Sequence, residues 1–280
     1  MTTQHDDRVD QASRWWSTDI IDIHPGEISI RGHAIQDLIG RISFPEMIWL
    51  MLRGELPGKA QAALLEAALV SSVDHGPHAP SIAISRMAIS CGVDLNGAMG
   101  SAVNVLGDIH GGAGQQCMEI YRDSQARAAR GEPQPVQAAL DAYRAEHGKI
   151  VPGFGHRFHP RDPRAKRLLA LVDEAVAQGV VSGEFARIGR QVEVILEQEK
   201  GRHIPMNIDG VTAVIYAELG FEPELGRGIF ILSRSVGILA HAWEQMREGR
   251  RIKGPMPPSI PYAYTGPQHA ELPEQPSQQS

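Results

Sequence analysis

The sequence predicts a mainly α-helical protein with one short β-hairpin near its N-terminus. Aromatic residues make up only 5% of the 280 residues, and runs of β-branched residues are scarce. Alanine and leucine are abundant and recur with the spacing of amphipathic helices. Glycines follow these segments, at points where a helix end requires positive φ; those glycines are Gly92, Gly148, Gly179, Gly201 and Gly220.

The hairpin comes first along the chain. Ile20–Ile23 and Ile28–Ile30 are short apolar runs joined by the turn His24–Glu27. Helices are then expected at Lys59–Val70, Ser81–Cys91, Leu95–Leu106, Pro133–His147, Asp162–Gln178, Gly183–Lys200 and Gly210–Leu219. The longest, Leu225–Glu248, is apolar enough for burial and yet carries Arg234. With no internal repeat or long linker, a second domain has to be an insertion within the helical array.

Composition narrows the function classes. The net charge of −6 and the pI near 6.1 favour neither nucleic acid nor anionic lipid as a partner. Cys91 and Cys117 lack CxxC spacing, so a disulfide framework or zinc finger is not expected. The N-terminal stretch is polar, and no apolar run approaches the roughly 20 residues of a membrane span. We therefore expect a cytoplasmic protein that does not contact membranes.

Two histidines stand in glycine-rich breaks between helices. His110 lies in the stretch GDIHGGAG, where Gly111 and Gly112 let the backbone approach a ligand closely. His156 lies in VPGFGHRFHPRDPRA, which also holds three arginines and three prolines and cannot be a regular helix. A lone histidine in a turn is usually structural, and the glycines beside His110 weaken that interpretation without overturning it.

Charged residues at expected helix starts are the next candidates. Asp162 and Pro163 fit the N-cap and first position of a helix, which places Arg164 in a first turn that disfavours a cation unless an anion binds there. Asp209 stands in the apolar stretch IPMNIDGV. It could N-cap the following helix, or be a desolvated base with a raised pKa. His75 and His78 are close in sequence, but without a carboxylate partner they make a weak metal site, and no metal is expected.

Taken together and in this order, six segments resemble the citrate synthase superfamily. They are GEISIRGHAIQDLIGRISFPEMIWLMLRGELP, DHGPHAPS, GDIHGGAG, PGFGHRFHPRDPRA, IPMNIDGVTAVIYAELG and SRSVGILAHAWEQ, and they span about Ile20 to Gly266. The chain is similar in size to stand-alone citryl-CoA lyases. The resemblance implies a two-domain helical fold and a homodimer, with a large domain at 1–111 and 221–280 and a small acyl-CoA-binding domain at 112–220.

The resemblance also implies roles for individual residues. Asp209 would be the base that removes a proton from the α-carbon of an acyl-CoA, with acetyl-CoA as the expected one. His110 would stabilise the enol or enolate, and His156 would polarise the carbonyl of a 2-oxoacid such as oxaloacetate. His75, Arg164 and Arg234 would hold the oxoacid, and Arg157 and Arg161 are candidates for CoA phosphates. No tightly bound cofactor is implied, since the CoA thioester is itself a substrate.

One position departs from the family pattern. Gly254 stands where many citrate synthases carry an arginine that reaches the partner's site, so Arg251 or Lys253 substitutes for it or the oxoacid differs from oxaloacetate. The direction of the reaction is open at this point. Two other hypotheses also remain: a catalytically inactive relative that senses CoA esters, and a metal-dependent hydrolase.

Overall fold

The computed structural model describes residues 11–155, 162–249 and 259–267. Its N-terminal part is a small antiparallel sheet of three strands, β1 (Ile21–His24), β2 (Glu27–Ile30) and β3 (His33–Ala34), in the order β1-β2-β3. The expected hairpin is confirmed, with His24 paired to Glu27 across a tight turn in which Gly26 has φ of 84°. The short third strand was not expected; it follows a second turn, where Arg31 takes φ of 48°.

Helices account for most of the remaining chain, as the sequence predicts. They are α2 (Ile35–Leu38), α3 (Phe44–Arg53), α4 (Lys59–Ser72), α5 (Pro80–Ser90), α6 (Leu95–Val103), α7 (Ala113–Ala129), α8 (Pro135–His147), α9 (Pro163–Ala177), α10 (Glu184–Lys200), α11 (Ile208–Glu218) and α12 (Pro223–Glu248). All five glycines expected to end helices have positive φ, between 64° and 90°. Glycine adopts this conformation without the steric penalty that a side chain would add, so helix ends were readable from sequence.

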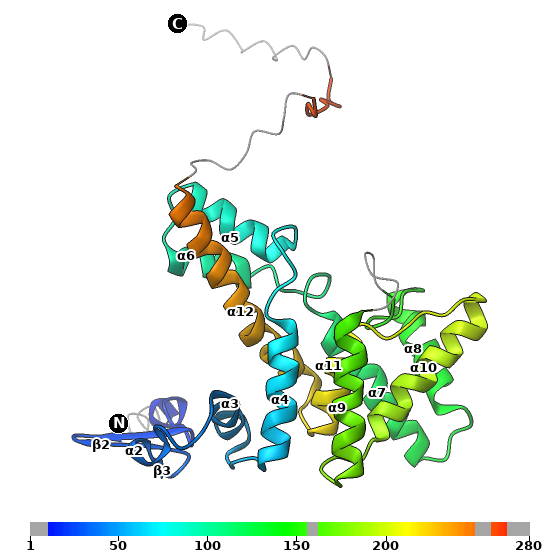
Figure 1. The fold of residues 1–280 in the computed structure, drawn as a ribbon, viewed down its shortest axis with the longest axis horizontal. Coiled ribbons are helices and arrows are strands. Elements are labelled where there is room, and N and C mark those ends of the chain that lie inside the picture. The colour runs from blue at the N-terminus through cyan, green and yellow to red at the C-terminus, as the bar shows by residue number, and fades with distance from the viewer. Residues whose placement is uncertain (1–10, 156–161, 250–258, 268–280) are drawn as a thin grey trace, which may run out of the picture.

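The core is built around α11. Nearly every residue of α11 is buried, and the helix packs against α4, α7, α9 and α10 (Figure 1). Tyr121, Tyr216 and Phe221 are among the largest fully buried side chains of this cluster. Such an all-round apolar helix is stable only when other helices enclose it.

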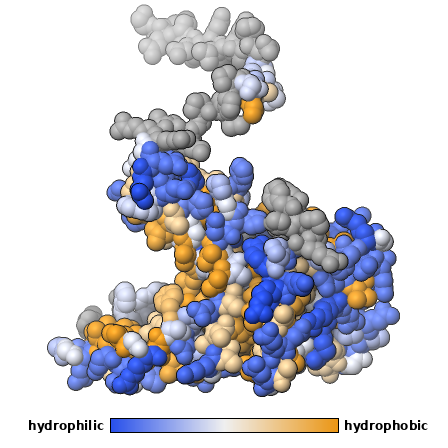
Figure 2. Space-filling view, in the orientation of Figure 1, coloured by the Kyte–Doolittle hydropathy of each residue, from blue (hydrophilic) through white to orange (hydrophobic). Residues whose placement is uncertain are grey.

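The long helix α12 joins two parts of the molecule. One part of it packs on α7 and α4 beside the central bundle, and another packs on α5 and α6 (Figure 1). Five large apolar side chains on α12 remain exposed at spacings of four and three residues: Leu232, Val236, Leu239, Trp243 and Met246. Figure 2 shows apolar surface along this side of α12. We call these five residues the α12 stripe.

None of the helices in the described ranges combines the length and the apolar character that crossing a membrane requires.

Candidate functional site

His110 is held at the N-terminus of α5. The backbone N–H of Ser81, in the first turn of that helix, donates to His110 Nε2 at 3.1 Å, and Ser81 Oγ lies 3.0 Å from the same atom. Because a backbone N–H can only donate, Nε2 must accept and the ring proton is on Nδ1. Burial, followed by the positive charge of Arg234, lowers the pKa of His110. The residue is therefore a neutral imidazole whose Nδ1–H can donate to a ligand.

The two glycines after His110 are required by the turn itself. Gly111 has φ of 104°, and a Cβ on Gly112 would lie 2.6 Å from the carbonyl oxygen of Asp108. Asp108 is also tied to α12, since Arg227 Nη2 lies 2.5 Å from Asp108 Oδ1. The turn that carries His110 is therefore compact and anchored to α12 before α7 begins.

Asp209 lies in the first turn of α11 but does not cap it. Asn207 is the N-cap, and its Oδ1 accepts hydrogen bonds from the backbone N–H groups of Asp209 at 2.9 Å and Gly210 at 3.3 Å. The interpretation of Asp209 as a cap is therefore wrong, and its carboxylate is left for another role. Although Asp209 is partly exposed, protein surrounds it closely, and this burial raises its pKa against the opposing charges of Arg234 and Arg164.

The glycine-rich loop before His156 packs directly on the start of α11. Gly153 and Gly210 touch backbone to backbone, and a Cβ on Gly210 would lie only 2.3 Å from the carbonyl oxygen of Gly153. Asn207 Nδ2 donates to the carbonyl oxygen of Gly155 at 2.6 Å. His156, Arg157 and Arg161 lie outside the described residues, but the residue before them is bonded to the cap of the Asp209 helix.

Arg164 lies in the first turn of α9, as expected, and its guanidinium is paired with a carboxylate of the same chain. Asp162 is the N-cap of α9, and its carboxylate accepts from Arg164 Nε at 2.9 Å and from Arg164 Nη2 at 2.8 Å. The same carboxylate accepts from the backbone N–H of Ile208 at 3.2 Å. Asp162 thus joins the N-termini of α9 and α11, a role that its N-cap sequence signal did not reveal.

Arg234 is a buried cation on α12. Its side chain donates from Nε to the carbonyl oxygen of Ser72 at 3.1 Å, and its guanidinium lies 4.9 Å from the ring centroid of Phe230. Burial lowers the pKa of Arg234, while the negative charges of Asp209 and then Asp74 oppose that shift. Since Arg234 also acts on the pKa values of His110 and Asp209, these three predicted site residues share one electrostatic environment.

His75 lies on the exposed segment between α4 and α5. Its neighbour Asp74 is bonded to His241 of α12, with 3.2 Å between Asp74 Oδ2 and His241 Nε2. Sequence reasoning missed Asp74 and His241 because they are 167 residues apart. Across the described ranges, no group of three or more histidine, cysteine, aspartate or glutamate side chains is arranged to hold a metal ion.

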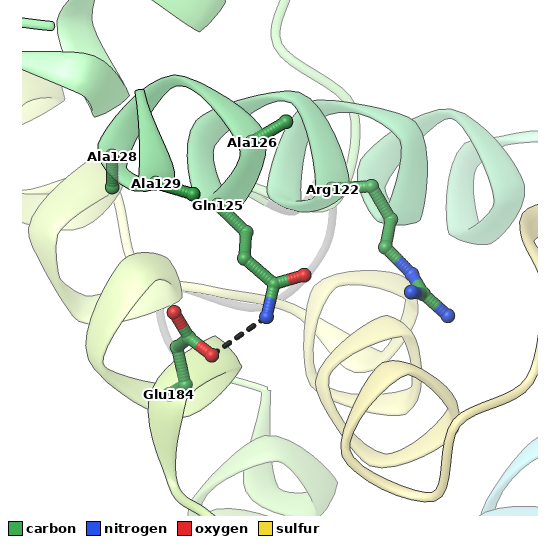
Figure 3. Close-up of a pocket in the computed structure, with 6 residues that line it drawn as sticks. All are labelled: Arg122, Gln125, Ala126, Ala128, Ala129 and Glu184. Carbon is green, nitrogen blue, oxygen red and sulfur yellow. Dashed lines mark hydrogen bonds between the residues drawn. The ribbon is translucent and has the colours of Figure 1, made fainter. Parts of the chain in front are cut away.

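An open pocket between α7 and α10 contains none of the predicted site residues. Arg122, Gln125 and Glu184 line it together with three alanines (Figure 3). Gln125 Nε2 donates to Glu184 Oε2 at 2.6 Å, and Arg122 Nη2 donates to the carbonyl oxygen of Phe221 at 3.1 Å. Arg122 Nε has no hydrogen-bond partner among the described residues, but Gln125 and Glu184 bind each other, and the predicted site residues lie elsewhere.

Comparison with known proteins identifies the family. A family model described as "Citrate synthase, C-terminal domain" matches residues 59–255. Citrate synthase from Haloferax volcanii is 33% identical over 206 residues, which is 72% of this chain and 52% of that protein. The chain therefore spans about half the length of the curated relatives it matches.

Among the solved structures that resemble this chain is one of similar length. Citryl-CoA lyase from Hydrogenobacter thermophilus has a TM-score of 0.80 and 33% identity, covering 92% of this chain and 97% of that one. Citrate synthase from Thermoplasma acidophilum, solved in a ternary complex with carboxymethyl coenzyme A and oxaloacetate, has a TM-score of 0.66 and 24% identity. It covers 82% of this chain and 58% of its own, and at that identity the likeness concerns the fold alone.

Proposed function

The chain belongs to the citrate synthase family, and from this premise we propose that it makes or breaks a carbon–carbon bond between an acyl-CoA and a 2-oxoacid. The observation that carries the proposal is that a closely surrounded carboxylate, Asp209, and a neutral imidazole, His110, both lie within the influence of the buried Arg234 cation. A thioester α-hydrogen is a weak carbon acid, so its removal needs both a base and a donor at the developing oxyanion.

The proposed reaction assigns one step to each group. In the condensing direction, the Asp209 carboxylate takes a proton from the α-carbon of the acyl-CoA while His110 Nδ1–H donates to the thioester oxygen. The α-carbon of the enolate then attacks the keto carbon of the oxoacid as the thioester C=O re-forms, and the keto oxygen takes a proton from His156, which gives a 3-hydroxyacyl-CoA. Asp209 then loses to solvent the proton that it removed, and His156 regains one from solvent. Cleavage runs these bond changes backwards. Arg234 supplies the positive charge that an oxoacid carboxylate requires, and Arg164, whose Nε and Nη2 already bind Asp162, has further N–H groups to donate, with His156 at the oxoacid carbonyl.

We favour citryl-CoA cleavage to acetyl-CoA and oxaloacetate as the reaction to test first. A citryl-CoA lyase that is 33% identical matches this chain over 97% of its own length. The citrate synthase of similar identity, from Haloferax volcanii, matches over only 52% of its length. A closable unit at 112–220, carrying Asp209 and His156, would exclude water from the acyl-CoA.

A homodimer forms part of the proposal. The α12 stripe repeats at alternating spacings of four and three residues, which is the pattern of a helix that buries one face against another helix. Leaving five large apolar side chains of one helix in water is unfavourable, and a second copy would cover them.

The test offers purified protein citryl-CoA and follows oxaloacetate, and separately offers acetyl-CoA with a panel of 2-oxoacids and follows the 3-hydroxyacyl-CoA product. Free thiol is followed as well, since it appears only if that thioester is then hydrolysed. Asp209→Asn should lower turnover by about 10²–10⁴-fold, the range of a lost general base, and leave CoA binding intact. Absence of turnover in both directions, together with retained CoA-ester binding, would instead support the CoA-sensing alternative.

A further inference from the structure

Asp74 joins the segment that carries His75 to the long helix α12. Its Oδ2 lies 3.2 Å from His241 Nε2 and accepts from the backbone N–H of Gly76 at 3.2 Å. The backbone of His75 also hydrogen-bonds to this carboxylate. Burial opposes ionisation of Asp74, but these hydrogen bonds outweigh it and the pKa of Asp74 lies below its usual value. A charged carboxylate therefore fixes the backbone on both sides of His75.

The segment rests on one face of α12. Arg234, Gly237 and His241 follow at spacings of three and four residues, which places them on the same side of the helix. A Cβ on Gly237 would lie 2.1 Å from the carbonyl oxygen of Val73 and 3.2 Å from Asp74 Cβ. This contact puts Asp74 directly on α12 in the span between Arg234 and His241.

His241 is oriented from its other side. Arg86 Nη1 lies 3.5 Å from His241 Nδ1, and Arg86 also pairs with Glu244 and Glu248. Because arginine can only donate, Nδ1 accepts and the ring proton is on Nε2, directed at Asp74. Arg86 and His241 thus form a chain of donors that ends on the Asp74 carboxylate.

The second carboxylate oxygen of Asp74 remains available to the site. Within the described residues its Oδ1 is buried and has no hydrogen-bond partner, and its negative charge acts on Arg234. A buried acceptor without a partner is costly, so its retention calls for a role beyond packing. Six residues after His75, the same stretch of chain reaches the Ser81 N–H that holds His110.

We propose that Asp74 and His241 are a positioning pair for the oxoacid end of the site. His241 holds Asp74, and Asp74 in turn fixes the backbone at His75 and faces the Arg234 charge. The inference rests on the proposed function, because it assigns His75 and Arg234 to the oxoacid. It adds two residues that need not touch any substrate.

Three substitutions test the pair. His241→Gln keeps an N–H donor close to the position of Nε2, whereas His241→Leu removes the donor at similar volume. Asp74→Asn keeps an acceptor oxygen but removes the charge that faces Arg234. Two exposed pairs elsewhere supply matched controls: His24→Leu, whose partner is Asp22, and Asp173→Asn, whose partner is Arg190.

Steady-state kinetics in the condensing direction separate the two substrates. His241→Leu and Asp74→Asn should raise KM for oxaloacetate by about tenfold or more, the effect of a lost charge-assisted hydrogen bond. KM for acetyl-CoA should stay within about twofold, and His241→Gln should recover most of the loss. Both controls should match the unsubstituted protein.

The outcomes distinguish this inference from the proposed function. If the unsubstituted protein turns over and the three variants behave like the controls, or if both KM values change equally, the positioning role is overturned. If the unsubstituted protein shows no turnover, calorimetric titration with oxaloacetate replaces the kinetics. Weaker binding by His241→Leu and Asp74→Asn then supports the pair, and unchanged binding overturns it. A protein that neither turns over nor binds any 2-oxoacid overturns both proposals.

Discussion

Replacing Gly237 with alanine should destabilise the protein, although alanine is the better helix former. The new methyl would lie 2.1 Å from the carbonyl oxygen of Val73, whereas non-bonded heavy atoms meet at about 3.5 Å. The segment between α4 and α5, which contains Val73, would have to move away from α12 by roughly 1 Å. Overpacking of this kind costs about 1–3 kcal/mol, and the gain in helix propensity returns about 0.5–1 kcal/mol. Because the clash is with backbone, which cannot swing aside, we expect a net loss of about 1–2 kcal/mol.

The same helix contains the matched control. Gly228 is exposed, and a Cβ there meets nothing within 4 Å, so Gly228→Ala should stabilise the protein by about 0.5–1 kcal/mol. At about 2–4 °C per kcal/mol for a chain near this size, the melting temperature should fall by about 2–8 °C for Gly237→Ala and rise by about 1–4 °C for Gly228→Ala. Thermal unfolding followed by circular dichroism measures both. Equal stabilisation by the two substitutions would refute the close contact between α12 and Val73.

Three further predictions concern the site and its surroundings. The pKa of Asp209 is raised in the folded chain, so the native state binds the extra proton and stability falls as pH rises through that pKa. Asp209→Asn removes this loss, so its advantage in melting temperature should grow as the pH rises above about 4, the pKa of an unperturbed aspartate. A difference that stays constant with pH would contradict the shift. Asn207→Ala removes the cap of α11 and should lower the free energy of unfolding by about 1 kcal/mol in a denaturant titration. It should also reduce turnover, because the hydrogen bond from Asn207 to Gly155 is lost. Full activity in this variant would show that the bond to Gly155 does not matter for turnover. Trp243→Asp places a charge within the exposed α12 stripe and should convert a dimer to a monomer, as measured by sedimentation velocity. An unchanged sedimentation coefficient would show that the α12 stripe is not the interface.

Local chemistry made much of the fold predictable. Most of the expected helices show an apolar periodicity that depends on residues three or four apart, and the five glycines expected to end helices all take positive φ. No range was expected for α2, α3 or α7. The N-cap at Asp162 was equally readable, because capping involves atoms within a few residues of each other. The same local rules failed at Asp209, where Asn207 two residues earlier captures the N–H groups that a cap would need.

By itself, then, the sequence determined the helical class of this protein, the hairpin, the helix ends and the residues Asp209, His110 and Arg234 as candidates. Tertiary structure decided what those residues are: His110 is neutral because an N–H from α5 occupies Nε2, and Arg164 is paired because Asp162 is within reach. It also decided that Asp74 meets His241, 167 residues further on. Such contacts depend on how helices pack across the molecule, and periodicity along one helix carries no information about which distant side chain faces it.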